Sequence, residues 1–184
     1  MTNLDDPIRW QELELRVREL YHKQFSDAQR SAVDFSKLIL TNLIWINAAG
    51  LGSLPVTAAF LGIGDMPWSQ KFPIILGPGL AFATGLFSAF MCALATYYNF
   101  DAIAKNANFD CSREIGDIRL THPETARNEE LKGRVEAERD HLAKSATEAN
   151  KRTRATLILS HLLGWASLLF FLFACYLLIT ISRA

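Results

Sequence analysis

Two short motifs in this sequence have the spacing of a metal-ligand pair. Glu19 and His22 form one Glu-x-x-His motif, and Glu138 and His141 form the other. In carboxylate-bridged di-metal helix bundles, a glutamate and a histidine three residues apart bind the metal from one face of a helix. Glu19, however, lies opposite the apolar face of its predicted helix. We therefore interpret both motifs as surface salt-bridging residues, expect no metal and no cofactor, and keep a di-metal protein as an alternative.

Other reactive side chains are scattered along the sequence. Cys92 and Cys175 lie in apolar segments, and Cys111 lies in a charged one. Three cysteines, none close to another, do not form a disulfide framework. We find no Walker loop, no dinucleotide-binding glycine pattern and no Ser–His–acid or Cys–His arrangement. The sequence therefore predicts that this protein is not an enzyme.

The elements that carry these residues are unusually segregated by polarity. The chain of 184 residues is 50% hydrophobic with a formal net charge of zero, which argues against a nucleic-acid partner. Three apolar blocks, 38–64, 73–98 and 155–181, each exceed the roughly 20 residues that a membrane-spanning helix needs. Because no Asp, Glu, Lys or Arg lies within these three blocks, the sequence also argues against an ion-coupled transporter.

The basic residues predict how the chain crosses the membrane. Segment 1–37 holds six Lys and Arg residues, segment 99–154 holds eleven, and both the loop 65–72 and the tail 182–184 hold one. Because basic segments stay on the cytoplasmic side, we expect 1–37 and 99–154 in the cytoplasm. The short loop 65–72 and the tail then face outward. The predicted location is the bacterial inner (plasma) membrane, with the N-terminus inside and the C-terminus external or periplasmic.

Both cytoplasmic segments are predicted to be charged helices. In 1–37, we expect an amphipathic helix that runs into the first span and packs on protein through one face, with a position flat on the membrane as the alternative. That face comprises Trp10, Leu13, Val17, Leu20, Tyr21, Phe25, Ala28, Ala32 and Phe35.

In segment 99–154, a new helix is expected to begin near Pro123 and to continue for more than 50 residues into the third span. Its weak heptad seam contains Leu131, Val135, Glu138 and Leu142. The predicted fold class is an all-α integral membrane protein with three transmembrane helices and a cytoplasmic, coiled-coil-like stalk.

Three polar side chains lie within the predicted spans. Asn42 and Asn47 are in the first span, and we expect both to face another helix because an asparagine in lipid requires a hydrogen-bonding partner. His161 lies in the first turns of the third span. We interpret it as a hydrogen-bonded residue near the membrane interface rather than as a proton relay.

The second span carries two adjacent stripes of small residues with a period of four. One stripe comprises Gly77, Ala81, Gly85, Ala89 and Ala93, and the other comprises Thr84, Ser88, Cys92 and Thr96. Small residues at this spacing allow helix backbones to approach closely within a membrane. The stripes predict either an interface between copies of the chain, including a pore lining, or packing against the first or third span, and both can apply.

The order of these elements resembles known membrane proteins. The elements are an amphipathic helix, a pair of spans whose first half contains Asn47–Pro55 (NAAGLGSLP), a charged helix and a last span. This order resembles small uncharacterised bacterial inner-membrane proteins. The architecture is also similar to SLATT-type two-span effectors of bacterial defence, and that resemblance implies oligomeric membrane disruption. This chain departs from those effectors by its third span, and no residue roles carry over.

We therefore expect a non-enzymatic, homo-oligomeric inner-membrane protein, a regulated pore or membrane effector whose cytoplasmic helices sense a signal or partner. An accessory or scaffold subunit of a membrane complex is the main alternative. The expected partners are the lipid bilayer, other copies of the chain, and a cytoplasmic or membrane protein.

Overall fold

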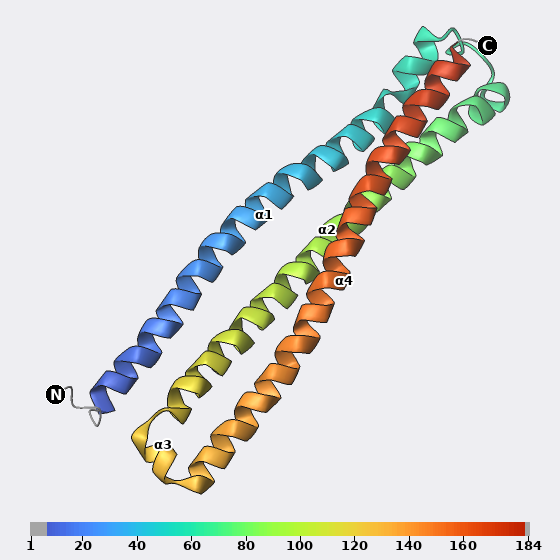
Figure 1. Cartoon of the computed structure of the whole chain (residues 1–184). Helices are drawn as coiled ribbons and strands as arrows, with labels where there is room; N and C mark the ends of the chain where they lie inside the picture. The colour runs from blue at the N-terminus through green and yellow to red at the C-terminus, as the bar shows by residue number, and fades with distance from the viewer. Residues whose placement is uncertain (1–6, 183–184) are drawn as a thin grey trace. The chain divides into compact units, whose positions relative to one another are not determined.

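The computed structural model describes residues 7–182, excluding the side chains at positions 7, 24, 28, 31 and 35. Four helices form from these residues, without any strand: α1 (Pro7–Phe60), α2 (Trp68–Leu120), α3 (Pro123–Arg127) and α4 (Glu129–Ile181) (Figure 1). α1, α2 and α4 are each long and apolar enough to cross a membrane. This confirms the all-α class with three candidate spans and indicates a membrane protein. Predictions for residues 1–6 and 183–184, and for the side chains of Ala28 and Phe35, lie outside the described residues.

The boundary between the first two spans differs from the prediction. α1 ends at Phe60 instead of 64, and α2 already begins at Trp68, so the expected loop 65–72 is shifted toward the N-terminus. Gly62 adopts a left-handed conformation with φ +74°. The amide of Gly62 donates to the carbonyl of Ala59, and the amide of Ile63 donates to that of Ala58. This is the glycine-dependent Schellman ending of a helix, which stops α1 although the sequence after it is still apolar.

The turn between α2 and α4 contains the short helix α3 (Figure 1). Its start at Pro123 was expected, and the His122 ring caps it by accepting from the amide of Glu124 at 3.2 Å. The prediction that this helix continues into the last span is wrong, because α3 ends at Arg127 and Asn128 interrupts the helix. The Asn128 side-chain oxygen accepts from the amides of Glu130 and Leu131, so Asn128 caps the start of α4. α4 itself is 53 residues long, which confirms the expected length of more than 50 residues.

The chain divides into two compact units. Unit 1 comprises Met1–Val33 and Tyr98–Ala155, and unit 2 comprises Asp34–Tyr97 and Thr156–Ala184. Unit 2 contains the apolar segments of α1, α2 and α4. Its core is a cluster of Leu54, Ala81, Phe82 and Ala174. The Phe82 ring is 1% exposed and lies 5.8 Å from the Phe171 ring, measured between centroids.

A glycine on α1 makes room for this central ring. A Cβ added at Gly50 would overlap the Phe82 ring, with its Cδ1 atom at 2.6 Å. Only a residue without a side chain therefore allows α1 and α2 to approach at this level. Away from the core, unit 2 exposes large apolar side chains, including Trp45, Val56, Phe87, Phe90, Leu162, Trp165 and Leu169. An apolar outer surface on three helices of spanning length is what a lipid environment requires.

Unit 1 is more polar and has a smaller core. Its buried side chains are mostly small: Asn99, Ala102, Ile115, Thr125, Ala146 and Ala149. The expected apolar face of α1 is rotated: Trp10, Val17, Tyr21 and Phe25 are partly buried, whereas Leu13 and Leu20 are 41% and 56% exposed. Glu14, which lies outside the predicted apolar face, is partly buried and pairs with Arg119 of α2. The side of α1 that packs in unit 1 therefore includes this acidic residue.

Candidate functional site

The α2 stripes pack against both neighbouring helices in unit 2. Ala81, Gly85, Ala89, Ser88 and Cys92 are buried within the chain, Ala93 and Thr96 are partly buried, and Gly77 and Thr84 are exposed. The thiol of Cys92 lies 3.1 Å from the Ser160 carbonyl oxygen of α4, and the Thr96 hydroxyl donates to the Cys92 carbonyl. Of the two interpretations left open by the sequence, packing within the chain accounts for the centre of both stripes. Gly77 and Thr84 remain exposed and available for an interface between copies.

Gly85 is the point where three helices meet. A Cβ at Gly85 would overlap Oδ1 of Asn47 on α1 and would lie 3.2 Å from the Ser167 carbonyl oxygen on α4. Nδ2 of Asn47 donates to the Leu43 carbonyl at 2.9 Å and to Oγ of Ser167 at 3.1 Å. Asn47 therefore faces another helix, as expected. We therefore expect a larger residue at Gly85 to destabilise the folded single chain, whether or not copies of the chain assemble.

One acceptor at this junction stays without a conventional partner. Oδ1 of Asn47 is buried and accepts no hydrogen bond. It lies against the backbone of Gly85, where a Cα–H group is a weak donor. The absence of a side chain at Gly85 therefore provides both the space for the amide and a polarised contact for its oxygen.

Asn42, the other asparagine of the first span, has a different environment. Its side chain is exposed on the outer surface of α1, and the prediction that it faces another helix is wrong within a single chain. Ala49, Gly52 and Ser53 are exposed on α1 as well, and a Cβ at Gly52 would meet nothing within 4 Å. At 100° per residue, Asn42, Ala49, Ser53 and Gly52 lie within about one third of the helix circumference. We call these four residues the outer α1 face.

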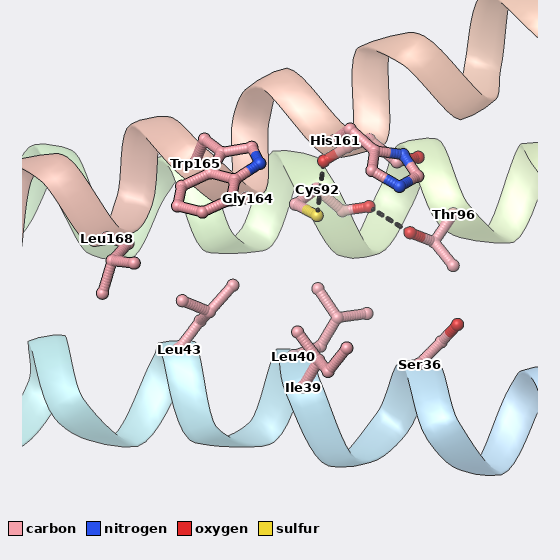
Figure 2. A pocket seen from close by; sticks show the side chains of 11 residues that line it. Ser36, Ile39, Leu40, Leu43, Cys92, Thr96, His161, Gly164, Trp165 and Leu168 are labelled. Carbon is pink, nitrogen blue, oxygen red and sulfur yellow. Dashed lines mark hydrogen bonds between the residues drawn. The ribbon is translucent and has the colours of Figure 1, made fainter.

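A groove lies between α1 and α4 in unit 2, with α2 as its floor (Figure 2). Its volume is about 330 Å³. Figure 2 shows Ser36, Thr96 and His161 at one end and Leu43 and Leu168 at the other. The lining residues are Ser36, Ile39, Leu40, Leu43, Cys92, Thr96, Ser160, His161, Gly164, Trp165 and Leu168. The groove is therefore amphipathic along its length.

His161 is hydrogen-bonded, in agreement with the interpretation from sequence. Its Nδ1 atom lies 2.8 Å from the Leu157 carbonyl oxygen. Because a carbonyl only accepts, Nδ1 carries the proton, and Nε2 of the neutral ring is an acceptor. The His161 side chain is exposed at the polar end of the groove.

In unit 1, a polar cluster joins the N-terminal part of α1 to the turn after α2. Arg119 donates to Glu14 through Nε at 2.9 Å and through an Nη atom at 3.1 Å. The Trp10 ring contacts the His122 ring edge-on at 5.2 Å between centroids. Arg119 lowers the pKa of Glu14 by hydrogen bonding to its carboxylate, and the same bond raises the pKa of Arg119.

The predicted seam on α4 is only partly closed. Leu131, Val135 and Glu138 line a cavity of about 310 Å³ together with Trp10, Glu14 and Arg119. Val135 and Leu142 are partly buried, but Leu131 is 39% exposed and Glu138 is also exposed. Arg139, rather than Glu138, lies beside Gly116 of α2, and its guanidinium is 3.5 Å from Asp117. The seam predicted from spacing therefore faces a cavity instead of forming a coiled-coil contact at every position.

A second cluster in unit 1 surrounds Tyr21. The hydrogen bond to the Glu114 carboxylate, followed by burial, raises the pKa of Tyr21 to about 12. Burial is also the main cause that raises the pKa of the nearby Cys111 thiol. Tyr21, His22 and Cys111 line a polar cleft of about 380 Å³ with Arg18 and Ser112. Both shifts favour the protonated forms of the phenol and the thiol.

The candidate metal ligands are not brought together. Among residues 7–182, no three His, Cys, Asp or Glu side chains are grouped so that they could hold a metal ion. Glu19 and His141 are exposed, whereas His22 and Glu138 line two different cavities. Cys92, Cys111 and Cys175 are free thiols.

The face of α4 that packs against α1 and α2 in unit 2 was not identified from the sequence. Ser160, Gly164, Ser167 and Ala174 follow one another at intervals of four, three and seven residues, which places them on one face of α4. Ser167 and Ala174 are fully buried on that face. This spacing was the available signal for both the Asn47 contact and the wall of the groove.

Comparison with known proteins adds no functional information. No family model, no curated protein and no solved structure matches this chain. The functional argument therefore depends on the residues themselves.

Proposed function

We propose that this chain is a non-enzymatic membrane protein that acts by self-association through the outer α1 face. The observation that carries the proposal is the exposure of Asn42, a polar amide about one turn inside the apolar segment of α1. An amide facing hydrocarbon is unfavourable, and a second helix provides the hydrogen bonds that lipid lacks.

The rest of the outer α1 face supports a close helix contact. Ala49 and Ser53 are four residues apart and exposed, and Gly52 has open space around it. This is the small-residue spacing by which helices associate in membranes. The exposed α2 and α4 surfaces carry Phe87, Phe90, Leu162 and Leu169, which suit contact with lipid chains. Trp45 and Val56 are exposed on α1 beside the outer α1 face and would flank the contact. The proposal therefore places the interface between copies on the outer α1 face, whereas the sequence left the α2 stripes open to such an interface or to packing within the chain.

The proposed activity is that of a regulated pore or membrane effector. In this proposal, residues 1–37 and 99–154 lie in the cytoplasm and form a helical stalk that receives the signal, following the distribution of Lys and Arg. Assembly in the membrane is the output, and no bond-making chemistry is required.

Native mass measurement in mild detergent tests the proposal. Wild-type protein should give a homo-oligomer, and Ala49→Leu should shift it toward the monomer because the longer side chain separates the helices. Ala83→Leu is the matched control, because Ala83 is exposed on α2 away from the outer α1 face. A monomeric wild type, or an oligomer that withstands both Ala49→Leu and Gly52→Leu, would contradict the proposal. Leakage of dye from vesicles that carry the protein tests the pore activity separately.

A second function, that of an accessory or scaffold subunit, is favoured by one feature of unit 1. Leu13 and Leu20 are seven residues apart, share one face of the charged part of α1, and are 41% and 56% exposed. In this proposal they lie in water, where exposed leucines on one helix face can bind a partner protein. This function predicts a stable hetero-complex in membranes purified without overexpression, and Leu20→Glu should disrupt it while leaving any homo-oligomer intact.

A further inference from the structure

We infer that the groove between α1 and α4 binds one acyl chain of a membrane phospholipid, with the lipid headgroup at the end formed by Ser36, Thr96 and His161. This inference does not depend on self-association, because every lining residue belongs to unit 2 of a single chain.

The shape and surroundings of the groove favour a linear apolar ligand. Along α1 it extends from Ser36 to Leu43, about 10 Å at 1.5 Å per residue, and along α4 from Ser160 to Leu168, about 12 Å. Its volume of about 330 Å³ is within the range of small-molecule sites. Ile39 and Trp165, at 45% and 64% exposed, form its rim. Because these segments have the length and composition of membrane spans, the rim opens onto lipid.

The order of the lining residues determines the orientation of the ligand. The inner part is apolar, with Leu40, Leu43 and Leu168 available to contact methylene groups (Figure 2). At the other end, the Ser36 hydroxyl can donate to an ester or phosphate oxygen, and Nε2 of His161 can accept from a headgroup amine or hydroxyl. A phospholipid has this same sequence of groups, from polar head to apolar chain.

Gly164 lies in the wall of the groove. A Cβ at this position would lie 3.7 Å from Sγ of Cys92 and 3.9 Å from Cδ1 of Leu43, which are ordinary contact distances. Alanine therefore fits without displacing either neighbour, whereas a phenylalanine ring would occupy the space of the ligand. Gly164→Ala and Gly164→Phe thus form a matched pair. Ile39→Trp blocks the groove independently, because it enlarges an exposed rim residue instead of changing the packed wall.

The inference is tested with a phospholipid that carries a photoactivatable group at the end of one acyl chain. Full-length protein is reconstituted into vesicles that contain this lipid, illuminated and analysed by peptide mass spectrometry. Labelling should be several-fold higher on Leu40, Leu43 and Leu168 than on the exposed Phe87 and Phe90 of α2. Gly164→Ala should retain the excess, and Gly164→Phe and Ile39→Trp should each lose it while Phe87 and Phe90 stay labelled.

A stability measurement gives the second readout. In detergent, added phospholipid should raise the thermal midpoint of the wild type and Gly164→Ala more than that of Ile39→Trp. Equal labelling of the groove and of the Phe87–Phe90 surface would overturn the inference, because it would show ordinary bilayer contact. In a separate experiment with a protein–protein crosslinker, a crosslink from the groove to a second copy of the chain would also overturn the inference, because a protein side chain would then occupy the site.

Discussion

The side-chain amide of Asn47 on α1 donates a hydrogen bond to the hydroxyl of Ser167 on α4, 120 residues further along the chain. Both side chains are fully buried. Gly85 of α2 lies against the same amide, so a single buried polar contact joins all three apolar helices. Within a membrane, where burial of apolar surface does not drive helices together, such a contact fixes their register.

Adding one carbon at this junction should destabilise the chain. In Gly85→Ala, the new Cβ would lie 2.9 Å from Cγ of Asn47 and 3.2 Å from the Ser167 carbonyl oxygen. We expect a loss of about 1–3 kcal/mol in the free energy of unfolding, the usual range for overpacking. Thermal unfolding in detergent, followed by circular dichroism, measures this loss.

The control for Gly85→Ala is the same substitution in open space. A Cβ at Gly133 meets nothing within 4 Å, so Gly133→Ala should stabilise α4 by up to about 1 kcal/mol. If the two variants changed the midpoint in the same direction, the close packing around Gly85 would be wrong.

The Asn47–Ser167 hydrogen bond should give a measurable coupling energy. A double-mutant cycle with Asn47→Ala, Ser167→Ala and the double variant isolates the pair from the packing changes at each site. Hydrogen bonds between membrane helices average about 0.6 kcal/mol in such cycles, and we expect a value of that size or larger. Additive effects of the two single substitutions would show that the contact contributes nothing beyond packing.

The lengths of the helices could be predicted from the sequence because long apolar and charged runs leave few alternatives. The ends of the helices depended on local signals that hydropathy does not contain. Gly62 ends α1 inside an apolar run, and Asn128 starts α4 inside a charged run. Both are single-residue capping effects, and they moved boundaries without changing the number of apolar helices.

The candidate site was harder to predict than the fold. The period of four on α2 identified Gly85 as a close-packing residue, but periodicity does not say which helix is the partner. The structure shows that α2 has two neighbours within its own chain, which is why two stripes are needed. The groove could not be predicted, because it results from the separation of α1 and α4, and that distance depends on the packing of all three helices together.

The Glu14–Arg119 pair should stabilise unit 1 in a pH-dependent way. Arg119 holds the pKa of Glu14 below its usual 4.5, so the contribution is present above the ordinary carboxyl range and is lost as pH falls through the lowered pKa. The side chain of Arg119 is 46% exposed, and solvent screening limits the effect to less than about 1 kcal/mol. Glu14→Gln should therefore lower the thermal midpoint at neutral pH and approach the wild type in acid.

Glu12→Gln is the control for the acid-dependent effect. Glu12 is exposed on the same part of α1, so its substitution should leave the pH profile of the midpoint unchanged. A Glu14→Gln profile that stays parallel to that of the wild type down to strongly acidic pH would contradict the ion pair.

The phenol of Tyr21 should stay protonated well above the ordinary tyrosine range. Its hydrogen bond to Glu114 raises the pKa to about 12. Because the pKa is higher in the folded state than the usual 10.0, this contact stabilises the protein fully below pH 10, and its contribution is lost as pH rises toward 12.

The phenolate absorbance of the wild type minus that of Tyr21→Phe isolates the titration of this one phenol. In Glu114→Gln, the midpoint should fall by at least about one pH unit, because removal of the negative charge makes ionisation of the phenol easier. Glu136→Gln, at an exposed position of α4, should leave the midpoint unchanged. A Tyr21 midpoint near 10 in the wild type would show that the phenol does not donate to Glu114, and the packing of α1 against α2 in unit 1 would need to be revised.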